Sequence, residues 1–276
     1  MTQNIYDHPE FFEGYAQLDR SVKGLKGAPE WPSIERILPD FKGLNIVDLG
    51  CGYGWFCREA RAKGAKQLLG MDLSTKMLDK ARQMTQDAQI TYQRANLEKL
   101  VFLENQYDLV YSSLALHYVE NLSGLLKTVY QALKPMGHFV FSAEHPIYTA
   151  GKQQGWLIDK EGQKLWPVNQ YQVEGKRVTN WLGAEVIKQH RTLGSYVNKL
   201  IQSGFIIKHL EEWGPSEQQV IQNSAKKLPT SLTSAKIQCP ESEMSYLLKL
   251  NMTRFSSKEI RYSPKKKDKR EDQKGG

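Results

Sequence analysis

Residues 45–56 read NIVDLGCGYGWF, and this stretch decides the fold. An apolar run leads into three closely spaced glycines, Gly50, Gly52 and Gly54, and a helical pattern begins directly after them. Glycines at such a strand-to-helix turn allow the backbone to approach a ligand closely. The stretch therefore predicts an α/β fold whose first strand ends at a ligand-binding turn.

Short β-rich runs alternate with helical segments along the rest of the chain, which is typical of a parallel sheet with crossover helices. We expect strands at residues 44–49, 66–72, 90–95, 107–113, 137–144, 205–213 and 243–250. Before the fifth strand, apolar residues at helical spacing indicate a helix with one buried face, namely Leu122, Leu125, Leu126, Val129 and Leu133. Pro135 follows the end of that helix, and Thr192 is the expected N-cap of a later helix that ends at Gly204.

Two regions lie outside this alternation. Residues 1–42 hold two short helical patterns, HPEFFEGYAQL and EWPSIERIL, which we interpret as an N-terminal helical cap. Residues 145–190 follow the fifth strand and are rich in aromatic residues. A long insertion at the carboxyl edge of a parallel sheet is usually functional, so we expect a lid within a domain at 43–256. A satellite hairpin with its own small core is the alternative.

The net charge of +8 is compatible with a nucleic-acid partner, but its distribution argues against one. Half of this charge, +4, lies in residues 258–276, where eight Lys or Arg residues accompany four acidic ones. Segments with this composition do not bury a core. We therefore expect a disordered basic tail at 257–276 and no nucleic-acid partner.

Composition also limits the location and the chemistry of the chain. No apolar run is long enough to span a bilayer and the N-terminal segment lacks signal-peptide features, so we expect a cytoplasmic protein without membrane contact. Cys51, Cys57 and Cys239 form no CxxC pair, and no cluster of ligating residues indicates a metal site. The oligomeric state stays open.

The residues around the glycine turn indicate which ligand it binds. The spacing is G-x-G-x-G rather than the G-x-G-x-x-G of dinucleotide sites, and no Gly-Lys-Ser/Thr follows as in a phosphate-binding loop. Asp48 precedes the turn, and an anion there is unfavourable beside a diphosphate but favourable beside an ammonium group. Asp72 and Asn96 end the next two strands, where a carboxylate can accept ribose hydroxyls and an amide can meet a nucleobase. These residues predict a cationic ligand with an adenosine-like portion.

At these positions the chain resembles the class I S-adenosylmethionine-dependent methyltransferases. The segments that carry the resemblance are, in the family's order, VDLGCGYG, GMDLSTKML, ANLEKL, YDLVYSSLALHYVENL and LKPMGHFVFS. The similarity runs from about Tyr6 to Leu250 and is greatest to small-molecule methyltransferases of bacteria, such as those of the ubiquinone-pathway and trans-aconitate type. It implies a Rossmann-like three-layer sandwich with a seven-stranded, mostly parallel sheet whose last strand is antiparallel. It also implies S-adenosylmethionine as cofactor and methyl transfer to a small-molecule acceptor.

The resemblance assigns cofactor contacts residue by residue. Asp48 and the turn from Gly50 through Cys51 and Gly52 to Gly54 would hold the methionine part. The other implied contacts are Asp72 on the ribose, Leu73 and Met77 beside the adenine, Asn96 and Leu97 at its edge, and Ser113 and Leu114 near the sulfonium. Asn96 stands where the family more often has Asp, and an amide oxygen can still accept from the adenine amino group.

Histidines and aromatic residues are the candidates on the acceptor side. His117 and His145 follow the fourth and fifth strands, where the substrate should lie, and are the candidate catalytic residues. A base is needed for a hydroxyl, amine or carbon acceptor but not for a carboxylate. Tyr15 could shelter the sulfonium by cation–π attraction. The candidate substrate contacts are Trp55, Tyr118, Tyr148, Trp181 and His190.

Two alternative functions remain at this point. Enzymes that methylate the amino groups of DNA, and many that act on RNA, carry an Asn/Asp-Pro-Pro-Tyr/Phe element where this chain has SSLALHY, which disfavours nucleic-acid methylation. The other alternative is a catalytically inactive cofactor-binding protein that acts through protein contacts.

Overall fold

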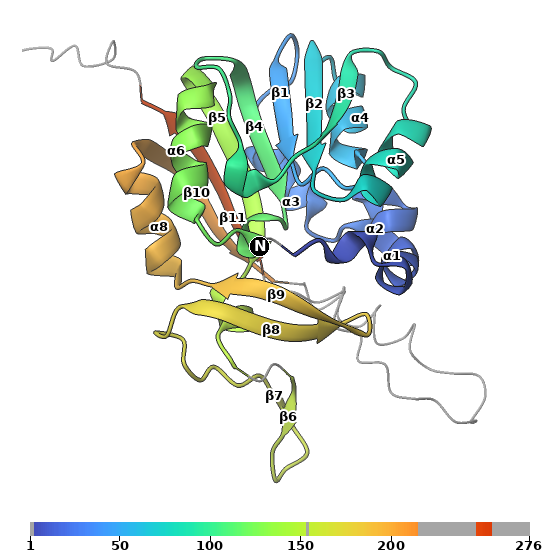
Figure 1. The fold of residues 1–276 in the computed structure, drawn as a ribbon. Coiled ribbons are helices and arrows are strands. Elements are labelled where there is room, and N and C mark those ends of the chain that lie inside the picture. The colour runs from blue at the N-terminus through green and yellow to red at the C-terminus, as the bar shows by residue number, and fades with distance from the viewer. Residues whose placement is uncertain (1–2, 153–154, 215–246, 256–276) are drawn as a thin grey trace, which may run out of the picture.

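The computed structural model describes residues 3–152, 155–214 and 247–255. Its centre is a seven-stranded sheet in the order β10-β11-β5-β4-β1-β2-β3 (Figure 1). The strands are β1 (Asn45–Leu49), β2 (Gln67–Asp72), β3 (Ile90–Arg94), β4 (Tyr107–Ser113), β5 (Leu133–Glu144), β10 (Phe205–Trp213) and β11 (Leu247–Arg254). Only β11 pairs antiparallel to its neighbours in this sheet. The predicted mostly parallel sheet with an antiparallel last strand is confirmed.

Helices cover both faces of the sheet. They are α3 (Trp31–Ile37), α4 (Trp55–Ala62) and α5 (Thr75–Gln83) on one face, and α6 (Leu122–Ala132) and α8 (Leu193–Gln202) on the other. The N-terminal helices α1 (Pro9–Ala16) and α2 (Asp19–Val22) contribute to neither of these two cores. Successive side chains of a strand point to opposite faces. Val47 and Leu49 of β1 accordingly pack with α6 and α8, whereas Ile46 packs with α3 and α4. The predicted three-layer arrangement is therefore confirmed.

Two strand boundaries differ from the sequence-based expectation. Leu133 was expected on the buried face of a helix, but α6 ends at Ala132 and Leu133 has an extended backbone that begins β5. Apolar periodicity cannot separate these cases, because Leu133 is fully buried either way. At the other end of the sheet, β11 extends to Arg254, beyond the predicted end at Leu250, and residues 243–246 lie outside the described residues. The expected basic tail at 257–276 also lies outside them.

The insertion and the N-terminal segment meet at one end of the sheet. After α7 (Pro146–Thr149) come two small hairpins, β6 (Leu157–Ile158) with β7 (Lys164–Leu165), and β8 (Gly175–Trp181) with β9 (Ala184–His190). Figure 1 shows the β8–β9 hairpin lying across that end of the sheet, near α1. The Gln3 side chain donates to the carbonyl of Glu185 and accepts from the amide of Ile187. The N-terminal segment and the hairpin are therefore joined at this end.

Before α1 and after α2 lie two short 3₁₀ helices, η1 (Ile5–Asp7) and η2 (Gly24–Gly27). The two predicted N-terminal helices correspond to α1 and α3. Among the described residues, no helix has the length and apolarity that crossing a membrane requires.

The N-cap of α8 offers a test of the fold. Thr192 Oγ1 accepts a hydrogen bond from the amide of Ser195 at 3.1 Å and donates one to Glu174. We expect Thr192→Ala to lower the free energy of unfolding in urea by about 0.5–2 kcal/mol. Thr128→Ala, inside α6, is the control and should change it by less than about 0.5 kcal/mol. Equal effects of the two substitutions would contradict the assigned cap.

Candidate active site

A cavity of about 870 Å³ lies where the carboxyl ends of the central strands meet the two covering segments. The sheet contributes the turn at Gly50, Asp72 at the end of β2 and Ser113 at the end of β4. Tyr15 of α1 and Trp181 of β8 border it from the covering side. This is the edge of a parallel sheet at which ligands bind in α/β folds.

Most residues proposed from the sequence line this one cavity. They are Tyr15, Asp48, Gly50, Cys51, Gly52, Trp55, Asp72, Leu73, Met77, Asn96, Leu97, Ser113, Leu114, His117, Tyr118, Tyr148 and Trp181. Gly54, His145 and His190 do not line it. The structure thus brings together residues from segments separated by more than a hundred positions in the chain.

Each of the three glycines in the turn is required for a different physical reason. Gly50 has φ +82°, and a Cβ there would lie 2.5 Å from the Cβ of Ala115. Gly52 has φ +51°, and a Cβ there would meet no protein atom within 4 Å, so a side chain would point into open cavity space. Gly54 has φ +69°, and its Cβ would lie 2.1 Å from the Tyr92 hydroxyl. The expectation that Gly54 contacts the cofactor gets no support, because its role here is close packing against Tyr92.

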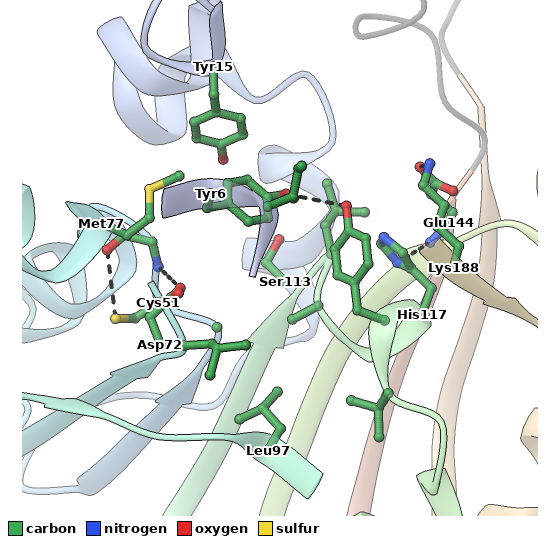
Figure 2. A pocket seen from close by; sticks show the side chains of 18 of the residues that line it. Tyr6, Tyr15, Cys51, Asp72, Met77, Leu97, Ser113, His117, Glu144 and Lys188 are labelled. Carbon is green, nitrogen blue, oxygen red and sulfur yellow. Dashed lines mark hydrogen bonds and ion pairs between the residues drawn. The ribbon is translucent and has the colours of Figure 1, made fainter. Parts of the chain in front are cut away.

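Asp72 fastens the glycine turn to the start of α5. Its Oδ2 accepts from the amide of Gly52 and its Oδ1 from the amide of Ser74, both at 2.9 Å. Burial raises the pKa of Asp72, and these backbone hydrogen bonds partly offset that rise. Figure 2 shows the Asp72 side chain near Cys51 and Met77, at one end of the pocket.

The N-terminal segment is attached over this same end. Asp7 of η1 accepts a hydrogen bond from Ser74 Oγ at 2.6 Å and another from the amide of Lys76 at 3.1 Å. Ser74 also caps α5 by accepting from the amide of Met77. A carboxylate at a helix N-terminus satisfies free amides and the helix dipole. The contact holds Tyr6, the residue before Asp7, at the cavity wall.

Asp48 is a buried acid with a weak protein partner. It is 2% exposed, and the donor recorded to it is the thiol of Cys57, at 3.6 Å. Burial raises its pKa to about 8. A cation in the adjoining cavity would favour the ionised form of this carboxyl. The site is therefore matched electrostatically to a positively charged ligand.

The opposite end of the cavity holds His117, Glu144 and Lys188 (Figure 2), and Tyr118, the residue after His117, also lines the cavity. Lys188 Nζ donates to Glu144 Oε1 at 2.6 Å, and the backbone amide of Glu144 donates to His117 Nδ1 at 3.3 Å. Burial lowers the pKa of His117 to about 4, so its ring is neutral near pH 7. The hydroxyls of Tyr118 and Tyr6 lie 3.2 Å apart and close the wall between the sheet and the N-terminal segment.

Comparison with known proteins identifies the family. A family model described as a methyltransferase domain matches residues 47–141. The crystal structure of an S-adenosylmethionine-dependent methyltransferase from Mesorhizobium loti is 49% identical, covers 84% of this chain and all of its own, and superposes with a TM-score of 0.73. The chain belongs to the S-adenosylmethionine-dependent methyltransferases. It is accordingly an enzyme with S-adenosylmethionine as its cofactor.

Two sequence relatives differ in what they show. An uncharacterized protein of Haemophilus influenzae is 36% identical over 233 residues, which are 82% of this chain and 92% of that protein. The malonyl-[acyl-carrier protein] O-methyltransferase of Erwinia billingiae is 36% identical over 102 residues. The chain spans only 39% of the length of that enzyme, so the match does not transfer its acceptor to this methyltransferase.

The cavity of this methyltransferase fits its cofactor at two points. Gly52 leaves open space where any side chain would intrude, and the Asp48 carboxyl has no cationic partner among the residues that the structure describes. Asn96 lines the cavity, and its Oδ1 accepts from the amide of Glu98 at 3.0 Å and caps a short turn, η3 (Leu97–Lys99). Its contact with the adenine stays a prediction.

The other two histidines are bound to the insertion rather than facing the cavity. His145 accepts from the amide of Ile147 through Nδ1, and its Nε2 lies 2.6 Å from Glu212 Oε1. His190 contacts Thr149 Oγ1 through Nδ1 and the carbonyl of Tyr171 through Nε2, at 2.7 and 2.8 Å. With both ring nitrogens occupied, His145 joins the insertion to β10 and His190 connects segments within the insertion. Nothing in their placement supports a catalytic or substrate-binding role.

Sequence reasoning missed several charged residues of the cavity. These residues form two ion pairs at the cavity wall. Arg20 pairs with Glu30 at 3.2 Å, and Lys188 pairs with Glu144. Glu144 could have been found from the sequence, because it is an acid at the end of a strand, as Asp72 is. No sequence pattern near Lys188 or Arg20 predicts that these residues line the cavity, because their ion-pair partners are distant or in irregular segments.

Two alanine substitutions separate backbone strain from cofactor exclusion. Gly52 and Gly43 both have positive φ and open space for a Cβ, but only Gly52 lines the cavity. Each alanine should lower the free energy of unfolding by about 1–2 kcal/mol, the strain of the left-handed conformation. Gly52→Ala should also weaken S-adenosylmethionine binding about tenfold to a hundredfold, as overpacking does. Calorimetric titration showing equal affinities for the two variants would contradict the assigned cradle.

Asp48→Asn should stabilise the fold and weaken cofactor binding. The pKa of Asp48 lies near 8 in the folded chain and near 3.8 when unfolded, so folding favours the protonated acid. The stabilisation from this acid is present at low pH and is lost as pH rises from about 4 to 8. The variant should therefore gain stability relative to the native chain by about 1 kcal/mol or more between pH 6 and pH 8 in urea titrations.

The same variant should bind S-adenosylmethionine more weakly near pH 8, because it offers no negative charge. Parallel stability profiles for the two proteins across that pH range would contradict the buried acid's role.

Proposed function

We propose that this enzyme transfers the methyl group of S-adenosylmethionine to a small-molecule acceptor bound in the same cavity. The observation that carries the proposal is the continuity of the cavity from the glycine turn to His117 under two covering segments. Tyr6, Tyr118 and Trp181 border its acceptor end, which favours a compact acceptor over a polymer. The cytoplasm is the compartment we propose for the reaction.

The chemistry divides between the cofactor and the chain. When bound, S-adenosylmethionine supplies a methyl group made electrophilic by a sulfonium. In the proposed arrangement Asp48 and the Gly50–Gly52 turn hold the charged methionine part, and Asp72 receives the ribose. Leu73, Met77 and Leu97 would pack beside the adenine, and Ser113 and Leu114 would border the sulfonium.

The covering segments act on the acceptor by positioning it and excluding water. Tyr15 packs edge-on against Trp181, with ring centroids 6.1 Å apart, so α1 and the β8–β9 hairpin share an aromatic wall. Alignment of nucleophile and methyl group, and removal of water, are the main tasks in such a transfer. This wall supports the interpretation of residues 145–190 as a lid, together with the helical cap at 1–42.

A labelling experiment tests the function. The purified enzyme is incubated with S-adenosylmethionine carrying a tritiated methyl group and a bacterial extract, which is then divided into an ultrafiltrate and a macromolecular fraction. We expect an enzyme-dependent label in the ultrafiltrate. Deletion of residues 258–276 should leave its rate within about twofold, as for changes remote from a site. Enzyme-dependent, salt-sensitive label in RNA or DNA would favour nucleic-acid methylation instead.

A further inference from the structure

The acceptor end of the cavity contains the Glu144 carboxylate and the neutral His117 imidazole. The hydrogen-bonding groups that these two side chains leave unused determine what can bind there. We propose that Glu144 is the proton acceptor of the reaction and His117 a hydrogen-bond donor to the acceptor molecule. The acceptor is accordingly a hydroxyl or amine compound rather than a carboxylate. This inference rests on the proposed transfer to a small molecule and assigns the chemistry of that molecule.

His117 is fixed in one protonation state by its contacts. Its Nδ1 accepts a hydrogen bond from the backbone amide of Glu144 at 3.3 Å, so the proton of the neutral ring lies on Nε2. The ring is 2% exposed, and burial keeps it neutral. Neither nitrogen then has a free lone pair. His117 can donate a hydrogen bond into the cavity but cannot remove a proton.

Glu144 has one oxygen engaged and one unengaged. Its Oε1 accepts from Lys188 Nζ at 2.6 Å, whereas its Oε2 is buried and has no hydrogen-bond partner in the described part of the chain. Burial acts to raise the pKa of Glu144, but the charge and the hydrogen bond of Lys188 act the other way and the pKa is lowered, so the group is ionised near pH 7. A buried carboxylate oxygen requires a donor. Glu144 lines the cavity, and an O–H or N–H group of a bound acceptor supplies that donor once the carboxylate turns toward it.

The positions of these groups agree with that role. Figure 2 shows His117, Glu144 and Lys188 together on one side of the pocket and Cys51, Asp72 and Met77 on the other, with Ser113 between them. His117 lies in η4 (Leu116–Tyr118), Glu144 ends β5, and Lys188 comes from β9 of the insertion. The lid thereby contributes the ammonium group that orients and ionises Glu144.

The proton balance of the step is simple for a hydroxyl acceptor. A lone pair of the acceptor oxygen forms the new bond to the methyl carbon while the carbon–sulfur bond breaks and leaves its electron pair on sulfur. The hydroxyl proton passes to Glu144 Oε2, while Lys188 stays protonated on Oε1. The products are a methyl ether, a thioether and a neutral Glu144, which loses its proton to solvent on product release. A carboxylate acceptor has no proton to give and offers no donor to Glu144 Oε2.

The stability of the labelled product to alkali distinguishes the two acceptor classes. The labelled ultrafiltrate is treated with mild alkali, which hydrolyses methyl esters to volatile methanol but leaves methyl ethers and methylamines intact. We expect the label to remain non-volatile. Release of labelled methanol would overturn the inference while leaving transfer to a small molecule in place. Enzyme-dependent label only in macromolecules, or none in any fraction, would contradict the proposed function itself and the inference with it.

Variants of Glu144 test its role as proton acceptor. Glu144→Gln should lower the labelling rate by about 10²–10⁴, the usual range for loss of a general base. Affinity for S-adenosylhomocysteine, measured by calorimetry, should change by less than about twofold. The double variant Glu144→Gln with Lys188→Met leaves no unpaired buried ammonium and should stay equally slow. Recovery of activity in the double variant would attribute the loss to the stranded lysine and overturn the inference.

Lys188→Met alone tests how the lid acts through Glu144. Removing the ammonium raises the pKa of Glu144, because burial then acts on it without the opposing charge of Lys188. The acid limb of the pH–rate profile should therefore move to higher pH. An unshifted profile with reduced rate would show that Lys188 is only structural and would contradict this assignment of Glu144.

Variants of His117 separate a donor from a base. Glutamine places an N–H near the position of Nε2, so His117→Gln should retain the rate within about tenfold, the scale of one hydrogen bond. His117→Ala removes the donor and should be slower than His117→Gln. If the two variants are equally slow and Glu144→Gln retains activity, His117 is the base and the inference is wrong.

Discussion

The close approach of Gly50 to Ala115 is the constraint on which the site depends. No Cβ fits between the two residues, so the turn after β1 lies directly against the segment that follows β4. The Gly50 amide also donates to the carbonyl of Met71, at 2.8 Å, which ties the same turn to β2. Three strand ends are thereby held together, and Asp48 and Asp72 are brought to one cavity.

The cavity is electrostatically divided between its two ends. At the cofactor end, Asp48 is a buried acid whose raised pKa reflects the lack of a strong partner, and the proposed cationic ligand would supply one. At the acceptor end, Glu144 is held ionised by Lys188, with its remaining oxygen unengaged. These two carboxyl groups respond differently to burial because only one has a lysine beside it. The two ends of the one cavity therefore suit ligand groups of different charge and hydrogen-bonding character.

Local patterns in the sequence predicted the strands of the sheet and Asp72 at the end of β2, and the family resemblance supplied the antiparallel last strand and Ser113. They failed where tertiary packing decides the outcome. Leu133 is buried equally well in a helix or a strand, and Gly54 is required by Tyr92, which is distant in the sequence. The Glu144–Lys188 pair joins β5 to the insertion across 44 positions, so no spacing rule could reveal it. His145 and His190 have the sequence context of site residues, yet their ring nitrogens are occupied by the protein.

The crystal structure of the enzyme with S-adenosylhomocysteine tests the central claim most directly, because it fixes which end of the cavity receives which ligand. The account predicts the amino group of the product beside Asp48 and the Gly50–Gly52 turn, and the ribose at Asp72. It also predicts that the sulfur faces past Ser113 toward His117 and Glu144. A sulfur directed away from these two residues, or a ribose remote from Asp72, would contradict it.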